Sequence, residues 1–280
     1  MNFETLNDNK LTEILINQIN AIKHLFNPFD EPEEGDGQKI YEESHKNFQE
    51  YIESSPVRPV EIRKPIYIQP IGNFSEKERK VINLTSEFIG IFFNLSININ
   101  PDLPLDIIPD KARRNNPEPQ LNTRYIIYQI LIPRFPKDAA VFIASTTIDL
   151  WPENGWNFVF GEAEDLVGVW SLNRFGDANG TKDEFQRCLL RAMKIATHET
   201  VHTFSLNHCI GYKCTMNHSN SLKELDRNPL MCCPDCMAKI CWILKTDPIS
   251  RYKKIKKFCQ GHGFIEEQRF FCDLIEVLQK

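Results

Sequence analysis

The 280-residue sequence predicts a mixed α/β fold. Runs of β-branched and aromatic residues, which are typical of strands, alternate along the chain with amphipathic helical patterns. Such alternation favours helices layered on a sheet. A chain of this length buries most of its apolar surface without help from disulfides.

Residues 1–63 differ from the rest and are predicted to form an N-terminal extension. Helical patterns cover Leu11–Phe26 and Gln38–Ile52. The acidic, turn-rich run Asn27–Gly37 between them indicates a loop or flexible linker. No recognisable catalytic pattern occurs in this part, so residues 64–280 are predicted to form the main domain.

The main domain begins with a strand, a long helical pattern and a second strand, and further β-rich runs follow. Strands are expected at Ile66–Pro70, Ser96–Ile99, Thr123–Ile132 and Ala139–Thr146, with Trp156–Phe160 pairing to Gly168–Leu172, and the first helix at Ser75–Leu95. A second helix is predicted from Thr181 to about Phe204. Thr181 and Glu184 have capping-box spacing at its start, and an apolar stripe follows.

The C-terminal end of this helix carries His198-Glu199-Thr200-Val201-His202, which is HExxH. Residues four apart share one face of a helix, so both imidazoles can bind one zinc ion. Glu199 lies about a hundred degrees round from His198 on the helix and is not a ligand. It is the candidate general acid/base.

His208 follows His202 by six residues, so the chain must turn after about Phe204 for it to reach the same metal. Three neutral histidines leave a fourth position for water, which is the open coordination of a catalytic zinc. Zinc lowers the pKa of its water and polarises the attacked carbonyl. Glu199 then moves the proton to the leaving amine. Hydrolysis of a peptide or related amide is the expected reaction.

Four cysteines have the spacing of a second, structural zinc site: Cys209, Cys214, Cys233 and Cys236. Cys232 is an alternative to Cys233, which is preferred because it gives the commoner CxxC spacing. His218 is an alternative ligand for either metal. Cys188, Cys241, Cys259 and Cys272 lack paired spacing and are expected to be buried or free thiols.

Charge and hydropathy exclude several classes of protein. The net charge of −5 and pI of about 5.9 argue against a nucleic-acid partner. No run approaches the roughly 20 apolar residues of a membrane span. The first residues lack the pattern of a secretory signal, so an intracellular protein, cytoplasmic or nuclear, is expected. In that setting cysteines are metal ligands or free thiols rather than disulfides.

These motifs resemble the archaemetzincin signature: HExxHxxGxxHC, four residues, CxM and a distal CxxC. The matching residues are His198–Cys209, Cys214-Thr215-Met216 and Cys233-Pro234-Asp235-Cys236. The resemblance extends over about residues 64–260 and is greatest to the eukaryotic, archaemetzincin-2-like branch. Outside the signature it includes Ile66–Gly72, Trp156–Ala163, Gly168–Phe175 and Asp226–Pro229.

The resemblance implies a metzincin-like zinc peptidase with a twisted mixed sheet, an active-site helix and a C-terminal part that holds zinc. Residues 64–280 would then be the catalytic domain, with one catalytic and one structural zinc ion. Met216 would occupy the family's Met-turn position beneath the catalytic metal. The substrate would be a peptide or protein. The resemblance suggests an aminopeptidase mode, but the sequence does not decide between this and an endopeptidase mode. The oligomeric state does not follow from the sequence.

One residue departs from the family pattern. Ser205 replaces the glycine that permits a positive φ where the helix ends. Either Ser205 takes this conformation at a cost of about 1–2 kcal/mol, or Asn207 takes it in a shifted turn. Ser205 is also the feature that favours the alternative function, a zinc-stabilised peptide- or protein-binding module with little or no hydrolysis.

Overall fold

The computed structural model describes residues 2–34, 36–37, 45–56, 58–59, 64–153 and 155–280. The chain divides into two compact units. The sheet unit comprises Pro59–Gly90 and Leu95–Thr203, and the helical unit comprises Met1–Arg58, Ile91–Asn94 and Phe204–Lys280. The expectation that residues 1–63 form a separate extension stays a prediction.

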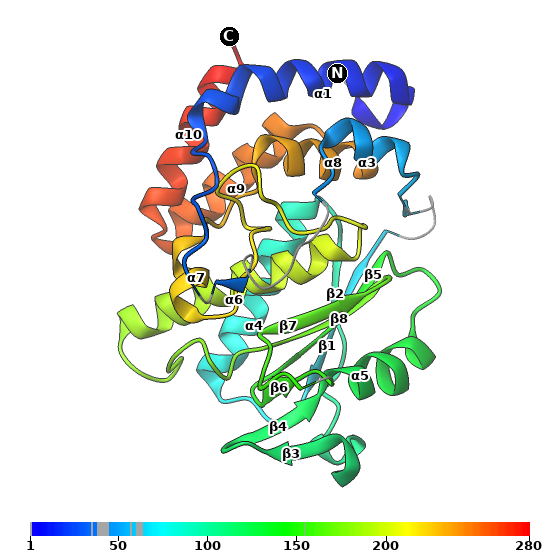
Figure 1. Cartoon of the computed structure of the whole chain (residues 1–280), viewed down its shortest axis with the longest axis vertical. Helices are drawn as coiled ribbons and strands as arrows, with labels where there is room; N and C mark the ends of the chain where they lie inside the picture. Colours follow the sequence, from blue (N-terminus) through cyan, green and yellow to red (C-terminus); the bar gives the residue numbers. More distant parts are fainter. Residues whose placement is uncertain (1, 35, 38–44, 57, 60–63, 154) are drawn as a thin grey trace. The chain divides into compact units, whose positions relative to one another are not determined.

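A five-stranded sheet is the frame of the sheet unit (Figure 1). Its strand order is β2-β1-β5-β8-β7, in which only the edge strand β7 runs antiparallel to its neighbour. The strands are β1 (Ile66–Ile71), β2 (Ile97–Ile99), β5 (Val141–Thr146), β7 (Gly161–Glu164) and β8 (Val167–Ser171). Every residue of the central strand β5 is buried, as in strands covered on both faces. The mixed α/β class and the strands expected near residues 66, 96 and 139 are confirmed.

A second, three-stranded sheet was not predicted. Its order is β3-β4-β6, and its strands are β3 (Arg113–Asn115), β4 (Pro119–Asn122) and β6 (Asp149–Trp151), preceded by the short helices η3 (Leu105–Ile107) and η4 (Asp110–Ala112). Strands this short leave no readable alternation in the sequence. The buried Asp149 carboxylate accepts hydrogen bonds from Gln120 Nε2 at 2.6 Å and from Arg174 Nε at 2.8 Å, which satisfies its charge.

Two long helices begin in the sheet unit, α4 (Glu76–Phe93) and α6 (Lys182–His202). The predicted capping box of α6 is confirmed, with the Thr181 and Glu184 side chains each bonded to the other's backbone N–H. Helix α6 packs against β7 and β8. Its C-terminal half is buried on more than one face, and the buried side chains there include polar and charged ones such as Thr197, His198 and Glu199.

The predicted strand at Thr123–Ile132 is wrong, because this segment is helical. It forms α5 (Thr123–Tyr125), the π-helical η5 (Ile126–Leu131) and η6 (Ile132–Arg134). The Asn122 side chain caps it by accepting from the Tyr125 N–H at 2.7 Å. The buried residues have helical spacing: Ile126, Ile127, Ile130 and Leu131. Packing of this face against β5 and β8 outweighs the strand propensity of a β-branched run.

The predicted pairing of Trp156–Phe160 with the strand near residue 168 is also wrong. The partner of β8 is β7, in a register from Gly161↔Trp170 to Glu164↔Val167. Asp165, with a φ of 51°, forms the tight turn between them, and aspartate tolerates this conformation better than most residues. The short turn fixes the register, so the strand begins only after Phe160.

The helical unit contains the N-terminal and C-terminal helices. They are η1 (Phe3–Thr5), α1 (Asp8–Ile22), η2 (Lys23–Leu25), α3 (Phe48–Glu53), α7 (Leu222–Arg227), α8 (Pro234–Leu244), α9 (Pro248–His262) and α10 (Ile265–Leu278). Helix α1 packs against α8 and α10, and α9 packs against α10. The helix predicted at Leu11–Phe26 is confirmed. Part of the one predicted at Gln38–Ile52, residues 38–44, lies outside the described residues.

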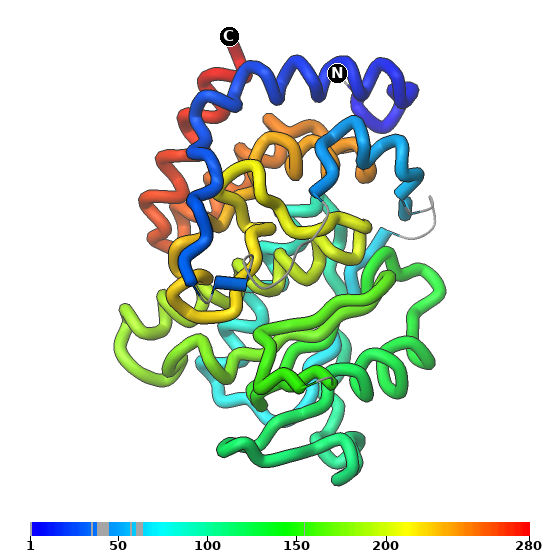
Figure 2. The backbone as a smooth tube through the Cα atoms, viewed as in Figure 1, coloured from blue at the N-terminus to red at the C-terminus, as the bar shows by residue number. Residues whose placement is uncertain are grey.

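The connection from α6 to α7 runs without a helix or a strand, apart from an isolated bridge between Tyr212 and Pro28 (Figure 2). This irregular segment carries most of the predicted metal ligands that follow His202. None of the helices in the described part of the chain is both long and apolar enough to cross a membrane.

Candidate active site and metal centres

Helix α6 brings His198 and His202 together on one face. Their Nε2 atoms are 3.0 Å apart, and their ring planes are nearly perpendicular, at 82°. Two nitrogens bound about 2.0–2.1 Å from a tetrahedral zinc ion lie roughly 3.3 Å apart. The two imidazoles therefore fit a shared metal ion, as HExxH predicted.

Glu199 lies between these histidines in sequence and is buried, with 6% of its surface exposed. Burial raises the pKa of its carboxyl well above the usual value of 4.5, and the nearby Glu162 carboxylate raises it further. A carboxyl group with a raised pKa is suited to accept and return a proton. Glu199 lies in the last turn of α6, three residues before the helix ends, so the helix fixes the position of its backbone.

The chain turns after α6 as expected. Thr203 caps the helix with helical φ and ψ, and Ser205 then adopts a φ of 62°. Of the two alternatives for the missing glycine, Ser205 itself takes the left-handed conformation. His208 follows in the helical unit, half-buried, with its ring centroid 4.6 Å from that of His218.

Four cysteines of the helical unit converge as their spacing predicted. The Sγ atoms of Cys209, Cys214, Cys233 and Cys236 all lie within 4.8 Å of one another, and all four residues are buried. Cys209 Sγ is 3.7 Å from Cys233 Sγ, close to the roughly 3.8 Å between two sulfurs bound 2.3 Å from a tetrahedral zinc ion. Of Cys232 and Cys233, the structure selects Cys233. All nine cysteines are free thiols.

The ionisation of these thiols also suits a cation. Neighbouring thiols, Cys214 foremost, lower the pKa of Cys209, whereas burial raises the pKa values of Cys214 and Cys233. Four buried thiolates repel one another and lose hydration, so they cannot all ionise without a compensating positive charge. A zinc ion would supply that charge, and the donor set fits a closed structural site.

A compact loop joins Cys209 to Met216. The Cys209 N–H donates to the Met216 carbonyl at 2.8 Å, and Met216 is fully buried. Asn217, which was not singled out from the sequence, organises this loop. Its Nδ2 donates to the Cys209 carbonyl at 2.7 Å, and its Oδ1 accepts from the Cys214 N–H at 2.7 Å. Its position directly after Met216 was the only sequence signal.

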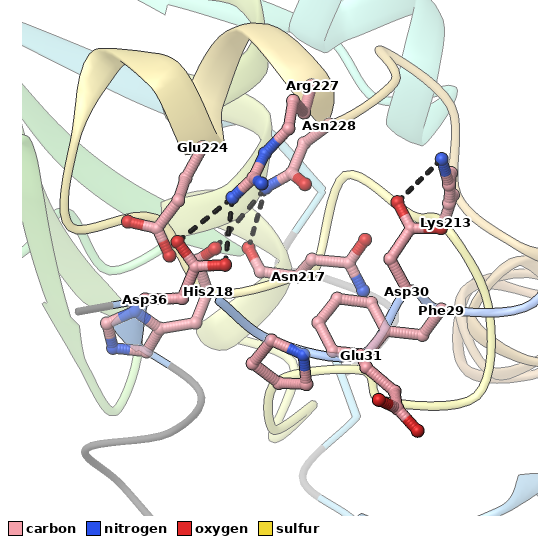
Figure 3. Close-up of a pocket in the computed structure, with 11 residues that line it drawn as sticks. Phe29, Asp30, Glu31, Asp36, Lys213, Asn217, His218, Glu224, Arg227 and Asn228 are labelled. Atoms are coloured by element: carbon pink, nitrogen blue, oxygen red, sulfur yellow. Dashed lines mark hydrogen bonds and ion pairs between the residues drawn. The ribbon is translucent and has the colours of Figure 1, made fainter. Parts of the chain in front are cut away.

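The remaining candidates lie outside the two sites. Burial raises the pKa of Cys188 to about 11 and that of Cys259 to about 12, as expected of unreactive buried thiols. Among the described residues, His218 belongs to neither group of potential metal ligands. It lines a small pocket together with Asp36, Glu224 and Arg227 (Figure 3).

That pocket lies where the acidic segment, defined as residues 27–34 and 36–37, contacts the chain between Lys213 and Asn228 (Figure 3). Lys213 Nζ pairs with Asp30 at 2.7 Å, and Arg227 pairs with Glu33 and Asp36, each at 2.9 Å. Backbone bonds add to these contacts, since the Lys213 N–H donates to the Asn27 carbonyl at 3.0 Å. The region expected to be a loop is thus attached along its length to the segment that carries Cys214 and Met216.

Comparisons with known proteins bear on the same residues. The family model described as Peptidase family M54 matches residues 139–241. Human Archaemetzincin-2 is 29% identical over 269 residues, which cover 84% of this chain and 74% of that protein. The archaemetzincin of Pyrococcus furiosus is 32% identical over 187 residues, which cover 64% of this chain and 93% of that protein.

Solved structures of archaemetzincins also align with this chain. The archaemetzincin of Archaeoglobus fulgidus, crystallised as a malonate complex, aligns with a TM-score of 0.51 at 29% identity, covering 62% of this chain and 99% of that one. The archaemetzincin of Methanopyrus kandleri aligns with a TM-score of 0.55, covering 68% and 100%. At 23% identity the second likeness concerns the fold alone.

Proposed function

The chain belongs to the archaemetzincin family and is a zinc metallopeptidase, and from this premise we propose that it hydrolyses peptide bonds with Glu199 as general acid/base. The observation that carries the proposal is the grouping of Glu199 with two histidines whose Nε2 atoms are 3.0 Å apart. A protein that used these histidines only for structure would have no need of a buried carboxyl group beside them.

His208 is proposed as the third ligand of the catalytic zinc. Only five residues separate it from His202, and the chain turns sharply at Ser205. The spacing HExxHxxxxxH supports this role, because three neutral nitrogen ligands leave the fourth position of a zinc ion open to water. Met216 is proposed to lie beneath this metal, as the family resemblance implies. Cys209, Cys214, Cys233 and Cys236 are proposed to hold a second, structural zinc ion.

His198, His202 and His208 would hold a zinc ion, which would supply Lewis acidity to polarise the scissile carbonyl and acidify a water molecule. Glu199 takes the proton of that water onto its carboxylate as the water attacks, and then donates it to the departing amine. The side chain's burial excludes bulk water from this proton transfer. General acid–base groups contribute about 10²–10⁴-fold in rate.

An aminopeptidase mode is a further part of the proposal. Its structural support is the charge of the edge strand beside Glu199, where Glu162 and Glu164 share one cation, Arg124, at 2.9 and 2.8 Å. The net negative charge of these three groups favours a substrate with a free amine. Matched peptides with free and acetylated N-termini test this mode, because an aminopeptidase cleaves only the free peptide.

The binding-module alternative depended on Ser205. Since Ser205 adopts the left-handed φ that the family glycine provides, the turn toward His208 is kept and this residue no longer favours loss of activity. Hydrolysis therefore remains the function that the site supports best.

The decisive experiment separates zinc binding from chemistry. Glu199→Ala is expected to keep wild-type zinc while turnover of a cleavable peptide falls about 10²–10⁴-fold. His202→Ala is expected to lose the catalytic zinc and the activity together, because it removes a ligand. Zinc content by mass spectrometry and cleavage of a broad peptide library are measured on the same samples. Wild-type turnover by Glu199→Ala would contradict its role, and a zinc-loaded wild type that cleaves nothing would favour the binding module.

A further inference from the structure

Edge strand β7 passes directly over the Glu199 side chain, and the residue at the crossing is Gly161. We infer that Gly161 is a positioning residue for the reaction: its lack of a side chain leaves the space in which the Glu199 carboxylate is held. This inference rests on the proposed role of Glu199 as general acid/base.

The distances show how little room exists. A Cβ atom built on Gly161 would lie 2.6 Å from Glu199 Cγ, 2.7 Å from Oε1 and 2.8 Å from Cδ. Carbon atoms in contact normally lie about 3.5–4.0 Å apart. Three consecutive groups of one side chain therefore occupy the place of the missing methyl group.

The backbone of Gly161 does not itself call for glycine. The glycines with positive φ in the described chain are Gly72, Gly155, Gly176 and Gly263, and Gly161 instead sits in a regular strand paired with Trp170 of β8. An alanine at this position would have an ordinary strand conformation. The close approach of Glu199 is thus the physical reason for glycine here.

Strand β7 is also held in place from its other face. Glu162, the next residue, accepts hydrogen bonds from the Thr123 hydroxyl and from Arg124 Nε, the latter at 2.9 Å. Arg124 also bonds Glu164 at 2.8 Å. With β8 on one edge and these bonds on one face, the strand cannot easily retreat from α6.

The part that gives way to a new methyl group is therefore the Glu199 side chain. Cγ, Cδ and Oε1 must all move, so the side chain has to rotate from its base, and this rotation moves the carboxylate away from the reacting water. A misplacement of about 1 Å can cost about 10²-fold in rate. Gly161→Ala should accordingly lower turnover while the zinc stays bound, and any loss of stability should come from the contact with Glu199.

The experiment compares Gly161→Ala with Gly168→Ala in the holoenzyme. Gly168 lies on the neighbouring strand, and its added Cβ would meet Ala163, the Glu162 carbonyl and Ile143, each at 3.3 Å, rather than Glu199. For Gly161→Ala we expect wild-type zinc content, KM within a few-fold and kcat lowered about 10²-fold. For Gly168→Ala we expect a loss of melting temperature without a comparable loss of kcat. Wild-type kcat in Gly161→Ala would overturn the inference.

A double-mutant cycle tests the contact itself. Removing the side chain in Glu199→Ala should abolish whatever loss of melting temperature Gly161→Ala causes. In Glu199→Asp, whose carboxylate is one methylene shorter, Gly161→Ala should lower kcat less than in wild type. Equal destabilisation of both backgrounds would overturn the inference even if the single variant folds poorly. A wild type that cleaves no peptide would instead overturn the proposed function, while the melting-temperature cycle would still report on the contact.

Discussion

Ser205 carries backbone strain at the point where the chain leaves the active-site helix. Its φ of 62° lies in the left-handed region, which costs a residue with a Cβ atom about 1–2 kcal/mol. The side chain is exposed, so no packing offsets this cost. The turn persists because the residues on both sides, Phe204 and Leu206, are buried.

Ser205→Gly is therefore expected to stabilise the protein. Relief of about 1–2 kcal/mol is offset by roughly 0.4–1 kcal/mol from the greater freedom of glycine in the unfolded chain, which leaves a net gain of about 1 kcal/mol or less. Urea denaturation of the zinc-loaded protein measures it. Asn207→Gly is the matched control, since Asn207 lacks a positive φ and should lose stability. If Asn207→Gly stabilised the protein and Ser205→Gly did not, Ser205 would not be the strained residue of this turn.

At the scale of elements, the acidic segment is held by ion pairs as well as by backbone hydrogen bonds. Its ion pairs with Lys213, Lys223 and Arg227 are partly exposed, and such pairs weaken as salt is added. A hydrogen bond and the charge of Lys223 lower the pKa of Glu33 below its usual 4.5. The contribution of Glu33 is thus fully present above pH 4.5 and is lost as the pH falls through the lowered pKa.

We expect hydrogen exchange at the Phe29 and Lys213 amides to be faster in Arg227→Ala than in wild type. Exchange in wild type should also become faster at about 1 M salt, because the screening length there is about 3 Å. These amides form the backbone bonds that join the acidic segment to the loop. Lys10→Ala, which removes the exposed pair with Glu13 on α1, is the control and should leave both amides unchanged. Equal exchange in Arg227→Ala and wild type would mean that the backbone bonds alone hold the segment.

At the scale of the whole molecule, we expect two zinc ions per chain, one at each proposed site. Cys233→Ser should lose the structural ion and fold poorly, because zinc bound to a closed cysteine site contributes about 10–16 kcal/mol that the unfolded chain lacks. Cys232→Ser is the matched control, since Cys232 is buried beside Cys233 but is not among the four converging thiols. Native mass spectrometry and thermal melts measure both.

A single zinc ion in the folded wild type would contradict the two-site proposal. The proposal would also be contradicted if Cys233→Ser melted like wild type. It would be contradicted equally if Cys232→Ser lost an ion while Cys233→Ser kept two.

The sequence by itself determined the features that depend on residues close to one another along the chain. His198 and His202 meet because residues four apart share a helix face, and the Thr181 capping box acts over three residues. The close spacing within each cysteine pair likewise predicted a shared metal site, and the same motifs indicated the family. Within each helical motif and each cysteine pair the groups are near in sequence, so the physical cause is contained in the pattern.

Only the tertiary structure decided features that depend on distant partners. The β-branched run at Thr123–Ile132 became helical because β5 and β8 offered a surface for one helical face. The partner of β8 was set by the turn at Asp165. Gly161 meets Glu199 across 38 residues of chain, and nothing in the local sequence marks that approach. Long-range packing selects among conformations that local propensity leaves close in free energy, which is why these contacts appear only in the folded molecule.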